Sequence, residues 1–194
     1  MKIIIATGNH DKFSEIRNVL NSHGITVVHR PMNIKEGDFE TLEQTAIAKA
    51  KRAFEIAKEP VLVDDTGIFF SAYKNFPGVK AKRVFTHVGF SGLMEALQGK
   101  DRSAYFKTVL CYAEKRDEYE LFEGIMKGRI DTKIHPGSRE KLPYERIFIP
   151  EGFQKAVSEM AGKEKEAISH RAMAAKKFTK FFCEKHGKQF IEFF

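Results

Sequence analysis

Apolar positions along this chain recur with the period of strands in some segments and with the period of helices in others. The apolar run over 2–6 predicts a buried strand, and apolar residues at helical spacing predict a helix over 10–23. A second run over 25–29 predicts another strand, and strand–helix–strand units normally hold their two strands parallel. The chain therefore begins as an α/β protein.

The rest of the pattern continues in the same mixed way. It predicts, in order, a helix over 41–57 with an alanine-rich face, a strand from 60 that ends at a tight turn at Thr66-Gly67, a further strand to 73, a helix near 91–98, a long hairpin of 103–114 and 119–130, a loop over 131–145, a strand over 146–150 and a last helix over 169–186. The length of 194 residues and the lack of internal repeats indicate one folding unit over 1–194.

The net charge of +7 admits three kinds of partner: nucleic acid, an anionic membrane or a polyanionic small molecule. The 33 Lys and Arg residues are spread among 26 acids without a long basic run, which is typical of a solvated surface. Aromatic residues do not gather among the basic ones, so nucleic-acid binding is not expected.

The cysteines indicate a reduced protein. Cys111 and Cys183 stand in apolar runs and neither belongs to a CxxC pair, so we expect a cytoplasmic location. The apolar run at the start is too short for a signal peptide, and no stretch approaches the roughly 18 apolar residues of a membrane span.

A candidate anion site follows the first predicted strand. Thr7, Gly8 and Asn9 would bring backbone N–H groups, a hydroxyl and an amide to a helix N-terminus, where the helix dipole favours an anion, and Lys12 adds a positive charge. The pattern is neither a Walker A nor a Rossmann motif, and an ordinary Asn-capped surface helix would show it too.

Two adjacent acids form a second candidate. Asp64 and Asp65 would lie at the carboxyl end of a buried strand, the edge at which open α/β sheets bind ligands. Adjacent carboxylates repel unless a cation or a proton lies between them, so a hard cation is their natural ligand. A turn-initiating Asp with a solvated neighbour is the structural alternative.

The start of the last helix is the third candidate. Ser169 can cap it, while His170 and Arg171 in its first turn would aim their hydrogen-bond donors outward, with Lys165 just before. Taken together, a positive turn, an acid pair and donors suited to a carbonyl-bearing ring point to a polyphosphate compound.

Four motifs stand in the order and spacing of one known family: ATGN..K..EI at 6–16, VLVDDTG at 61–67, FPGV at 76–79 and EKEAISHR at 164–171. Through these motifs the chain resembles the inosine triphosphate pyrophosphatase family, also called the Ham1-like enzymes, and SAYFKT at 103–108 is similar to archaeal members.

The resemblance implies Mg2+-dependent hydrolysis of ITP, XTP and their deoxy forms to the monophosphate and pyrophosphate, by attack of water on the α-phosphorus. It also implies a homodimer whose protomers have an elongated mixed β-sheet flanked by helices, with two lobes and a cleft between them. Carried over position by position, it assigns roles to residues that touch substrate or metal: phosphate binding to Thr7, Asn9, Lys12 and Lys165, catalysis to Asp65 with Asp64 beside it, metal binding to Asp65, and purine contacts to Ser169, His170 and Arg171.

Two positions depart from the family pattern. Gln44 stands where a metal-binding Glu is usual, and we hypothesise that Glu40 or Glu43 supplies the missing charge. The base-reading loop is LPYE at 142–145, in which Tyr144 keeps a ring that can stack on a base.

These departures leave alternatives open. The chain could prefer other bases, as a related fold that hydrolyses dTTP and UTP does, or it could bind nucleotides with reduced turnover. The apolar tail over 188–194 is expected to dock on the protein or on a dimer partner; its Phe spacing also loosely resembles sliding-clamp peptides, although Gly187 stands at their Gln position.

Overall fold

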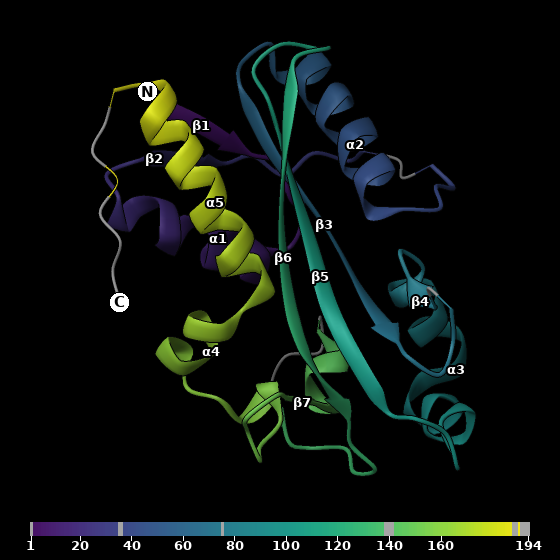
Figure 1. Ribbon diagram of the computed structural model, residues 1–194. Helices are drawn as coiled ribbons and strands as arrows, with labels where there is room; N and C mark the ends of the chain where they lie inside the picture. Colours follow the sequence, from purple (N-terminus) through teal and green to yellow (C-terminus); the bar gives the residue numbers. More distant parts are fainter. Residues whose placement is uncertain (1, 35–36, 75, 138–141, 188–189, 191–194) are drawn as a thin grey trace. The chain divides into compact units, whose positions relative to one another are not determined.

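The computed structural model describes residues 2–34, 37–74, 76–137, 142–187 and 190 (Figure 1). Its elements follow in this order: β1 Lys2–Ile5, α1 His10–Ser22, β2 Thr26–His29, α2 Leu42–Ala57, β3 Val61–Phe70, β4 Pro77–Gly78, α3 Ala81–Ala96, β5 Ser103–Ala113, β6 Tyr119–Ile130, the 3-10 turn η1 Pro143–Arg146, β7 Phe148–Pro150, the 3-10 turn η2 Val157–Glu159, α4 Gly162–Ile168 and α5 His170–Lys185. The predicted α/β class is confirmed.

The strands within the described ranges form one mixed sheet. Their order is β2-β1-β3-β5-β6-β7, with β4 beside β3. β1 pairs in parallel with β2, up to Ile5 opposite His29, and in parallel with β3, where Ile4 lies opposite Val61. β4 and β7 pair antiparallel with β3 and β6. The predicted parallel unit is therefore confirmed, and the segments that follow β1 and β2 leave the sheet at the same edge.

The chain divides into two compact units. Unit 1 comprises Met1–Asp65, Thr108–Gly124 and His170–Phe194, and unit 2 comprises Thr66–Lys107 and Ile125–Ser169. β3, β5 and β6 each begin in one unit and end in the other.

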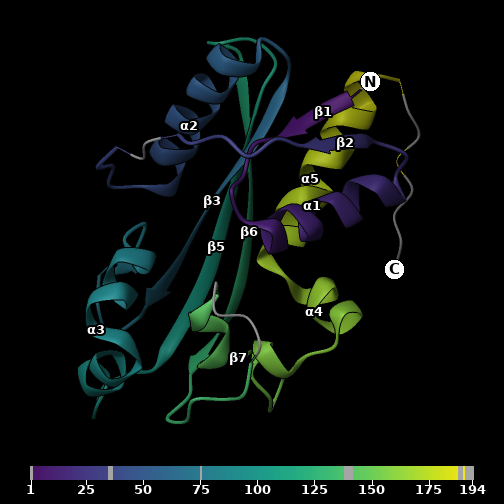
Figure 2. The same ribbon diagram turned by 180° about the vertical axis from the view of Figure 1, so that it is seen from behind.

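Unit 1 has helices on both sides of its strands. In Figures 1 and 2, α1 and α5 lie side by side, and α2 lies on the opposite side of the strands. Buried apolar and aromatic residues fill the core that α1 and α5 cover: Phe13, Ile16, Leu20, Tyr112, Phe178 and Phe182. On α2, Ala46, Ala50 and Ala53 are fully buried, as the alanine-rich face predicted.

The tail is partly docked on this core. Phe190 packs against it and stacks on His23 with ring centroids 4.8 Å apart. The other residues of the predicted tail, 188–189 and 191–194, lie outside the described residues.

Unit 2 has a separate core. It contains buried apolar residues of α3 and of the strands, among them Phe70, Leu93, Phe106 and Phe148. Gly89 has a φ of 58° inside α3, so this helix consists of two helical segments joined at a residue that needs the left-handed region.

The tight turn predicted at Thr66-Gly67 is wrong, because β3 runs without interruption through both residues. A Cβ built on Gly67 would lie 2.6 Å from the carbonyl oxygen of Gly78 in β4. The glycine therefore permits the close approach of the neighbouring strand rather than a turn.

One helix is longer than predicted, and another was not predicted. α3 starts at Ala81, about ten residues before the predicted helix. Ala81, Val84 and Phe85 have helical spacing and contribute to the core of unit 2, so the signal was present in the sequence and was overlooked. The short helix α4 was not predicted; Lys165 is its buried residue, so no apolar stripe marks it.

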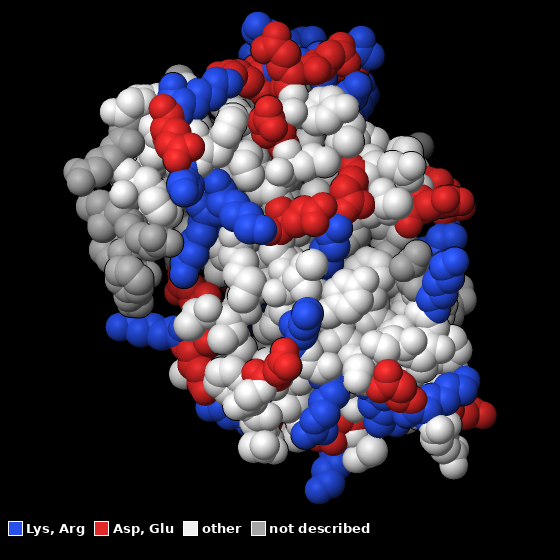
Figure 3. All heavy atoms as spheres, in the orientation of Figure 1, with Lys and Arg blue, Asp and Glu red and all other residues white. Residues whose placement is uncertain are grey.

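The surface drawn in Figure 3 is mixed in charge, and both cysteines are buried. On the face drawn in Figure 3, Lys and Arg are interleaved with Asp and Glu rather than gathered in one basic patch. Cys111 and Cys183 are buried and unpaired with each other, and burial raises the pKa of the Cys111 thiol to about 12. No helix in the described ranges has both the length and the apolar character to cross a bilayer.

Gly124 of β6 sets how closely α5 packs on the sheet. A Cβ built there would lie 1.9 Å from the carbonyl oxygen of His170, so we expect Gly124→Ala to push the start of α5 away and to destabilise the protein by about 1–3 kcal/mol. Thermal and urea unfolding would measure the loss. Gly162→Ala is the matched control, because no atom lies within 4 Å of a Cβ at that position. Equal stability of the two variants would contradict the prediction.

Candidate functional site

The turn between β1 and α1 is ordered by its own polar side chains. Asn9 caps α1, since its Oδ1 accepts hydrogen bonds from the backbone N–H of Asp11 at 2.9 Å and of Lys12 at 3.3 Å. The N–H of Asn9 donates in turn to Thr7 Oγ1 at 3.3 Å. The predicted cap is therefore confirmed, and these contacts fix a helix N-terminus directly after a buried strand.

The two acids lie in β3, just past the residues that pair with β1. Lys12 Nζ is 2.6 Å from Asp64 Oδ2, and Lys49 Nζ is 3.2 Å from Asp65 Oδ1. Lys49 also donates to the backbone carbonyl of Asp64 at 3.0 Å. Each carboxylate thus has its own lysine, one from α1 and the other from α2.

The start of α5 reaches the same group. Arg171 is 1% exposed; its NH1 lies 2.6 Å from Glu15 Oε2, and its Nε lies 3.9 Å from Asp64 Oδ2. The turn after β1, the acid pair and the start of α5 therefore converge within unit 1, although they are separated by more than 150 positions in the chain, as the Glu15–Arg171 pair shows.

The prediction that the first turn of α5 aims its donors outward is wrong. His170 and Arg171 are 4% and 1% exposed, and His170 Nδ1 lies 2.6 Å from Thr108 Oγ1 of β5. The physical reason is the close packing at Gly124, which brings the first turn of the helix against the sheet and buries it.

The two neighbouring carboxyl groups have opposite pKa shifts. Burial favours the neutral form of Asp64, but Lys12, Arg171 and Lys49 outweigh it and hold the pKa of Asp64 well below its usual range. Burial raises the pKa of Asp65 to about 6, and the charge of Asp64 adds to the rise, while Lys49 and Lys12 oppose it. Asp64 is therefore a permanent anion, whereas Asp65 can exchange a proton close to neutral pH.

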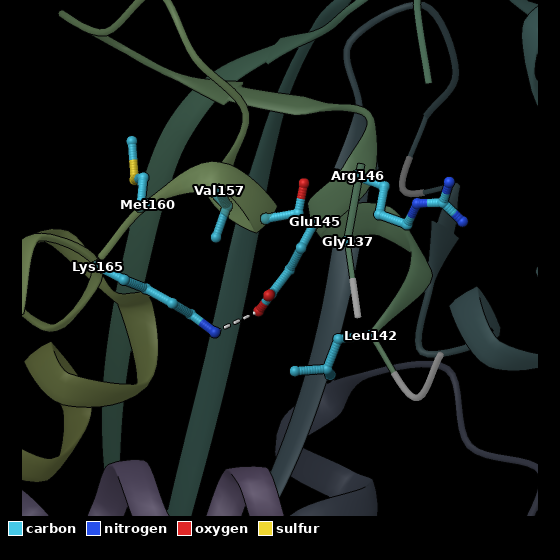
Figure 4. Close-up of a pocket in the computed structure, with 8 residues that line it drawn as sticks. Gly137, Leu142, Glu145, Arg146, Val157, Met160 and Lys165 are labelled. Carbon is cyan, nitrogen blue, oxygen red and sulfur yellow. Dashed lines mark hydrogen bonds and ion pairs between the residues drawn. The ribbon is translucent and has the colours of Figure 1, made fainter. Parts of the chain in front are cut away.

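Three predicted residues lie in unit 2. Lys165 Nζ is 2.7 Å from Glu145 Oε1, and both side chains are less than a tenth exposed (Figure 4). Ser169 is buried and has an extended backbone between α4 and α5. Tyr144 packs in the core with its hydroxyl donating to the carbonyl of Ala81 at 2.8 Å.

These contacts change the picture of the LPYE loop. Tyr144 is 6% exposed, so its ring is not open for stacking on a base in this structure. The loop instead lines a pocket of about 170 Å³, to which Leu142, Glu145 and Lys165 contribute (Figure 4). This volume is smaller than the roughly 300–1,000 Å³ typical of sites that enclose a whole small molecule.

The acids proposed to replace a metal ligand lie at the start of α2. Thr41 caps that helix by accepting the N–H of Gln44 at 3.2 Å, and Gln44 Oε1 accepts the N–H of Glu40 at 3.2 Å. Glu40 is exposed and Glu43 is half-buried. Within the part of the chain that the structure describes, no three Asp, Glu, His or Cys side chains form a cluster that could hold a metal ion by themselves.

Sequence analysis missed the contributions of Lys49, Glu15 and Glu145. Lys49 had a visible signal, because it lies three positions after Ala46 and four before Ala53, on the face of α2 that packs on the strands. Glu15 stood inside a quoted motif without a role. Glu145 had no local signal, since its partner lies 20 positions away.

This chain is similar to several known proteins and to one family model. The sequence model of the Ham1 family matches residues 3–181. The dITP/XTP pyrophosphatase of Saccharolobus solfataricus is 36% identical over 185 residues, which cover 93% of each chain. The inosine triphosphate pyrophosphatase of Yarrowia lipolytica is 35% identical over 187 residues, covering 95% of this chain and 97% of its own. A solved HAM1 protein structure from Coxiella burnetii has a TM-score of 0.79 at 26% identity and covers 95% of this chain and 99% of that chain.

The raised pKa of Asp65 predicts a particular pH dependence of stability. Between its ordinary pKa of 3.8 and its folded value of about 6, the folded protein keeps a proton that the unfolded chain has lost. The contribution of Asp65 to the free energy of unfolding therefore falls as pH rises through that window. Because Asp65→Asn removes this effect, the stability of the variant relative to the wild type should increase from pH 4 to pH 7, by at most about 3 kcal/mol.

Urea unfolding of both proteins at several pH values would measure this difference. Asp117→Asn is the matched control, since Asp117 is an exposed acid whose hydrogen bond to Lys51 lowers its pKa, the direction opposite to that of Asp65. A difference between Asp65→Asn and wild type that stays constant or shrinks as pH rises would contradict the assignment.

Proposed function

Because this chain belongs to the Ham1 family, we propose that it hydrolyses non-standard purine nucleoside triphosphates, namely ITP, dITP and XTP, to the nucleoside monophosphate and pyrophosphate. The observation that carries the proposal is the pairing of Lys12 with Asp64 and of Lys49 with Asp65 beside a capped helix N-terminus. This arrangement offers positive charge to a polyphosphate and a carboxylate able to take a proton.

The proposed chemistry is attack of water on the α-phosphorus. Asp65 accepts a proton from the water as its oxygen bonds to phosphorus, and the bond from the α-phosphorus to the bridging oxygen breaks, so that pyrophosphate leaves. A pKa of about 6 suits this role, because a general base is most effective when its pKa lies near the working pH.

The lysines would hold the phosphates by changing partners. Lys12 and Lys49 are 18% and 15% exposed, so most of their water is already removed in the free protein. A phosphate oxygen that replaces a carboxylate as the partner therefore meets cations that are already positioned and partly desolvated, which favours electrostatic stabilisation of the transition state. Thr7 and Asn9 would add hydroxyl and amide contacts from the turn.

The donor set fits a divalent cation that is shared with substrate. Mg2+ in phosphoryl-transfer sites is usually bound by one or two carboxylates together with phosphate oxygens and water, and the Asp65 carboxylate, with a side chain 12% exposed, is of that kind. Asp65, with Glu40 or Glu43 as predicted, would hold it. When bound, the cation would neutralise charge on the triphosphate.

The base contacts remain predictions. Ser169, His170 and Arg171 are proposed to read the purine, the last two by donating to its 6-oxo group, which adenine lacks. Lys165 keeps its predicted phosphate role and would have to leave Glu145 to fulfil it. The LPYE loop favours a second possibility within the same reaction, an altered base preference, because Tyr144 is buried in the core.

The remaining proposals concern the assembly and location. The homodimer is inferred from the resemblance alone, and the cytoplasmic location from the two unpaired cysteines. Sedimentation of the purified protein would test the dimer.

A panel of nucleoside triphosphates tests the proposed substrate class. We expect pyrophosphate release from dITP and XTP to exceed that from ATP by at least about tenfold in kcat/KM, because the 6-oxo group of hypoxanthine or xanthine can accept a hydrogen bond that the 6-amino group of adenine cannot accept. Detection of pyrophosphate and monophosphate, rather than orthophosphate, would establish which bond is cleaved. Equal rates with ATP, or a preference for UTP, would exclude the purine 6-oxo selectivity.

Lys49→Met tests whether the lysine of α2 belongs to the phosphate site. Loss of one charged hydrogen-bond donor should lower kcat/KM for dITP by about 10- to 100-fold. Lys51→Met is the matched control on the same helix, because Lys51 pairs with Asp117 at the surface, and it should retain wild-type kinetics. Similar kinetics of the two variants would remove Lys49 from the site.

A further inference from the structure

His29 makes a contact with the phosphate-binding turn that the proposed chemistry does not use. Its Nε2 lies 2.8 Å from the backbone carbonyl oxygen of Thr7. His29 is the last residue of β2 and lies opposite Ile5, so its side chain reaches the backbone two positions beyond the end of β1. Because a carbonyl oxygen only accepts hydrogen bonds, Nε2 must carry the hydrogen.

The imidazole ring of His29 is held in place by the first turn of α1. The ring of Phe13 stacks on it, with centroids 4.2 Å apart and planes inclined by 14°. The ring of His10 approaches edge-on at 6.0 Å. Phe13 is tied to the turn, since its N–H donates to the carbonyl of Asn9 at 3.1 Å. The imidazole is therefore fixed between the helix and the Thr7 carbonyl.

This contact sets the direction of a neighbouring donor. The peptide between Thr7 and Gly8 is planar, and in a trans peptide the carbonyl and the N–H point in opposite directions. A carbonyl held by His29 therefore turns the N–H of Gly8 away from the imidazole. Gly8 is exposed, and a Cβ built on it would meet no atom within 4 Å, so this peptide borders open space.

We propose that His29 is a positioning residue for phosphate binding: its Nε2–H holds the Thr7 carbonyl and thereby aims the N–H of Gly8 at a phosphate group of the substrate. His29 acts through the backbone and does not itself touch the phosphate. The inference rests on the proposed function, since it assigns a polyphosphate to the turn.

Two variants separate this role from simple packing. His29→Phe keeps a ring to stack on Phe13 and removes the donor, whereas His29→Gln removes the ring and keeps an N–H donor at the end of the side chain. We expect His29→Phe to raise the KM for dITP and the Kd for inorganic pyrophosphate by about two- to tenfold, with kcat changed by less than about twofold. His29→Gln should stay nearer to wild type in both quantities.

His87→Phe is the matched control. His87 is an exposed histidine whose Nδ1 lies 2.7 Å from the backbone carbonyl of Arg83, so this substitution also removes a ring nitrogen near a carbonyl, and it should leave both quantities unchanged. Thermal unfolding would show that each variant is folded. If His29→Phe does not fold, His29→Gln decides. This variant keeps a donor, so the proposal expects it to bind pyrophosphate nearly as well as the wild type. A folded Gln variant whose Kd rises about two- to tenfold would overturn the proposal.

A spectrum of the unmodified protein tests the hydrogen position directly. Long-range proton–nitrogen correlation should show His29 with a hydrogen on Nε2 near neutral pH, and a neutral ring protonated on Nδ1 alone would overturn the proposal. Unchanged pyrophosphate binding by His29→Phe, with dITP hydrolysis intact in wild type, would refute only the role of His29. A wild-type protein that neither binds pyrophosphate nor hydrolyses dITP would refute the proposed function and this inference together.

Discussion

The ion pair between Lys12 and Asp64 is the contact on which the site depends. It joins the first turns of α1 to the middle of β3, and Asp64 is 2% exposed. Removing the partner of a buried carboxylate destabilises a protein by about 3–5 kcal/mol. Lys12 can therefore leave Asp64 only if another cation takes its place beside the carboxylate. Arg171 lies near the same carboxylate and also pairs with Glu15, which ties the start of α5 to α1. One buried charge thereby sets the relative positions of three segments of unit 1.

Local chemistry made part of this arrangement predictable from sequence. The apolar run before Thr7, the capping side chain of Asn9 and the helical spacing after it are all contained within a few residues, so the strand, the turn and the helix could be placed. The acid pair was also located correctly on a buried strand, because Asp64 and Asp65 follow three apolar residues. These signals act within one or two turns of chain, the range over which propensity and periodicity operate.

Three errors of the sequence analysis come from contacts between distant segments. Gly67 looked like a turn residue, but the constraint on it comes from β4, which packs against its backbone. His170 and Arg171 were placed outward by a rule for isolated helix ends, whereas Gly124 lets the sheet approach and bury them. The side chain of Tyr144 was assigned an open face, but its hydroxyl is bonded inside the core of unit 2. No pattern within a single element carries such information.

The alternation of side chains along β3 explains why two adjacent acids can have different chemical roles. Successive residues of a strand point to opposite faces of the sheet, and the lysine of Asp64 comes from α1 whereas the lysine of Asp65 comes from α2. In Figures 1 and 2 these two helices lie on opposite sides of the strands. Asp64 is therefore surrounded by Lys12 and Arg171 and stays ionised, while Asp65 is more strongly governed by its burial and by the charge of Asp64, which raise its pKa. Because neighbouring side chains in a strand point to opposite faces, two adjacent acids reach two different environments. One becomes a fixed anion that orders the site, and the other a carboxyl group that can take up a proton.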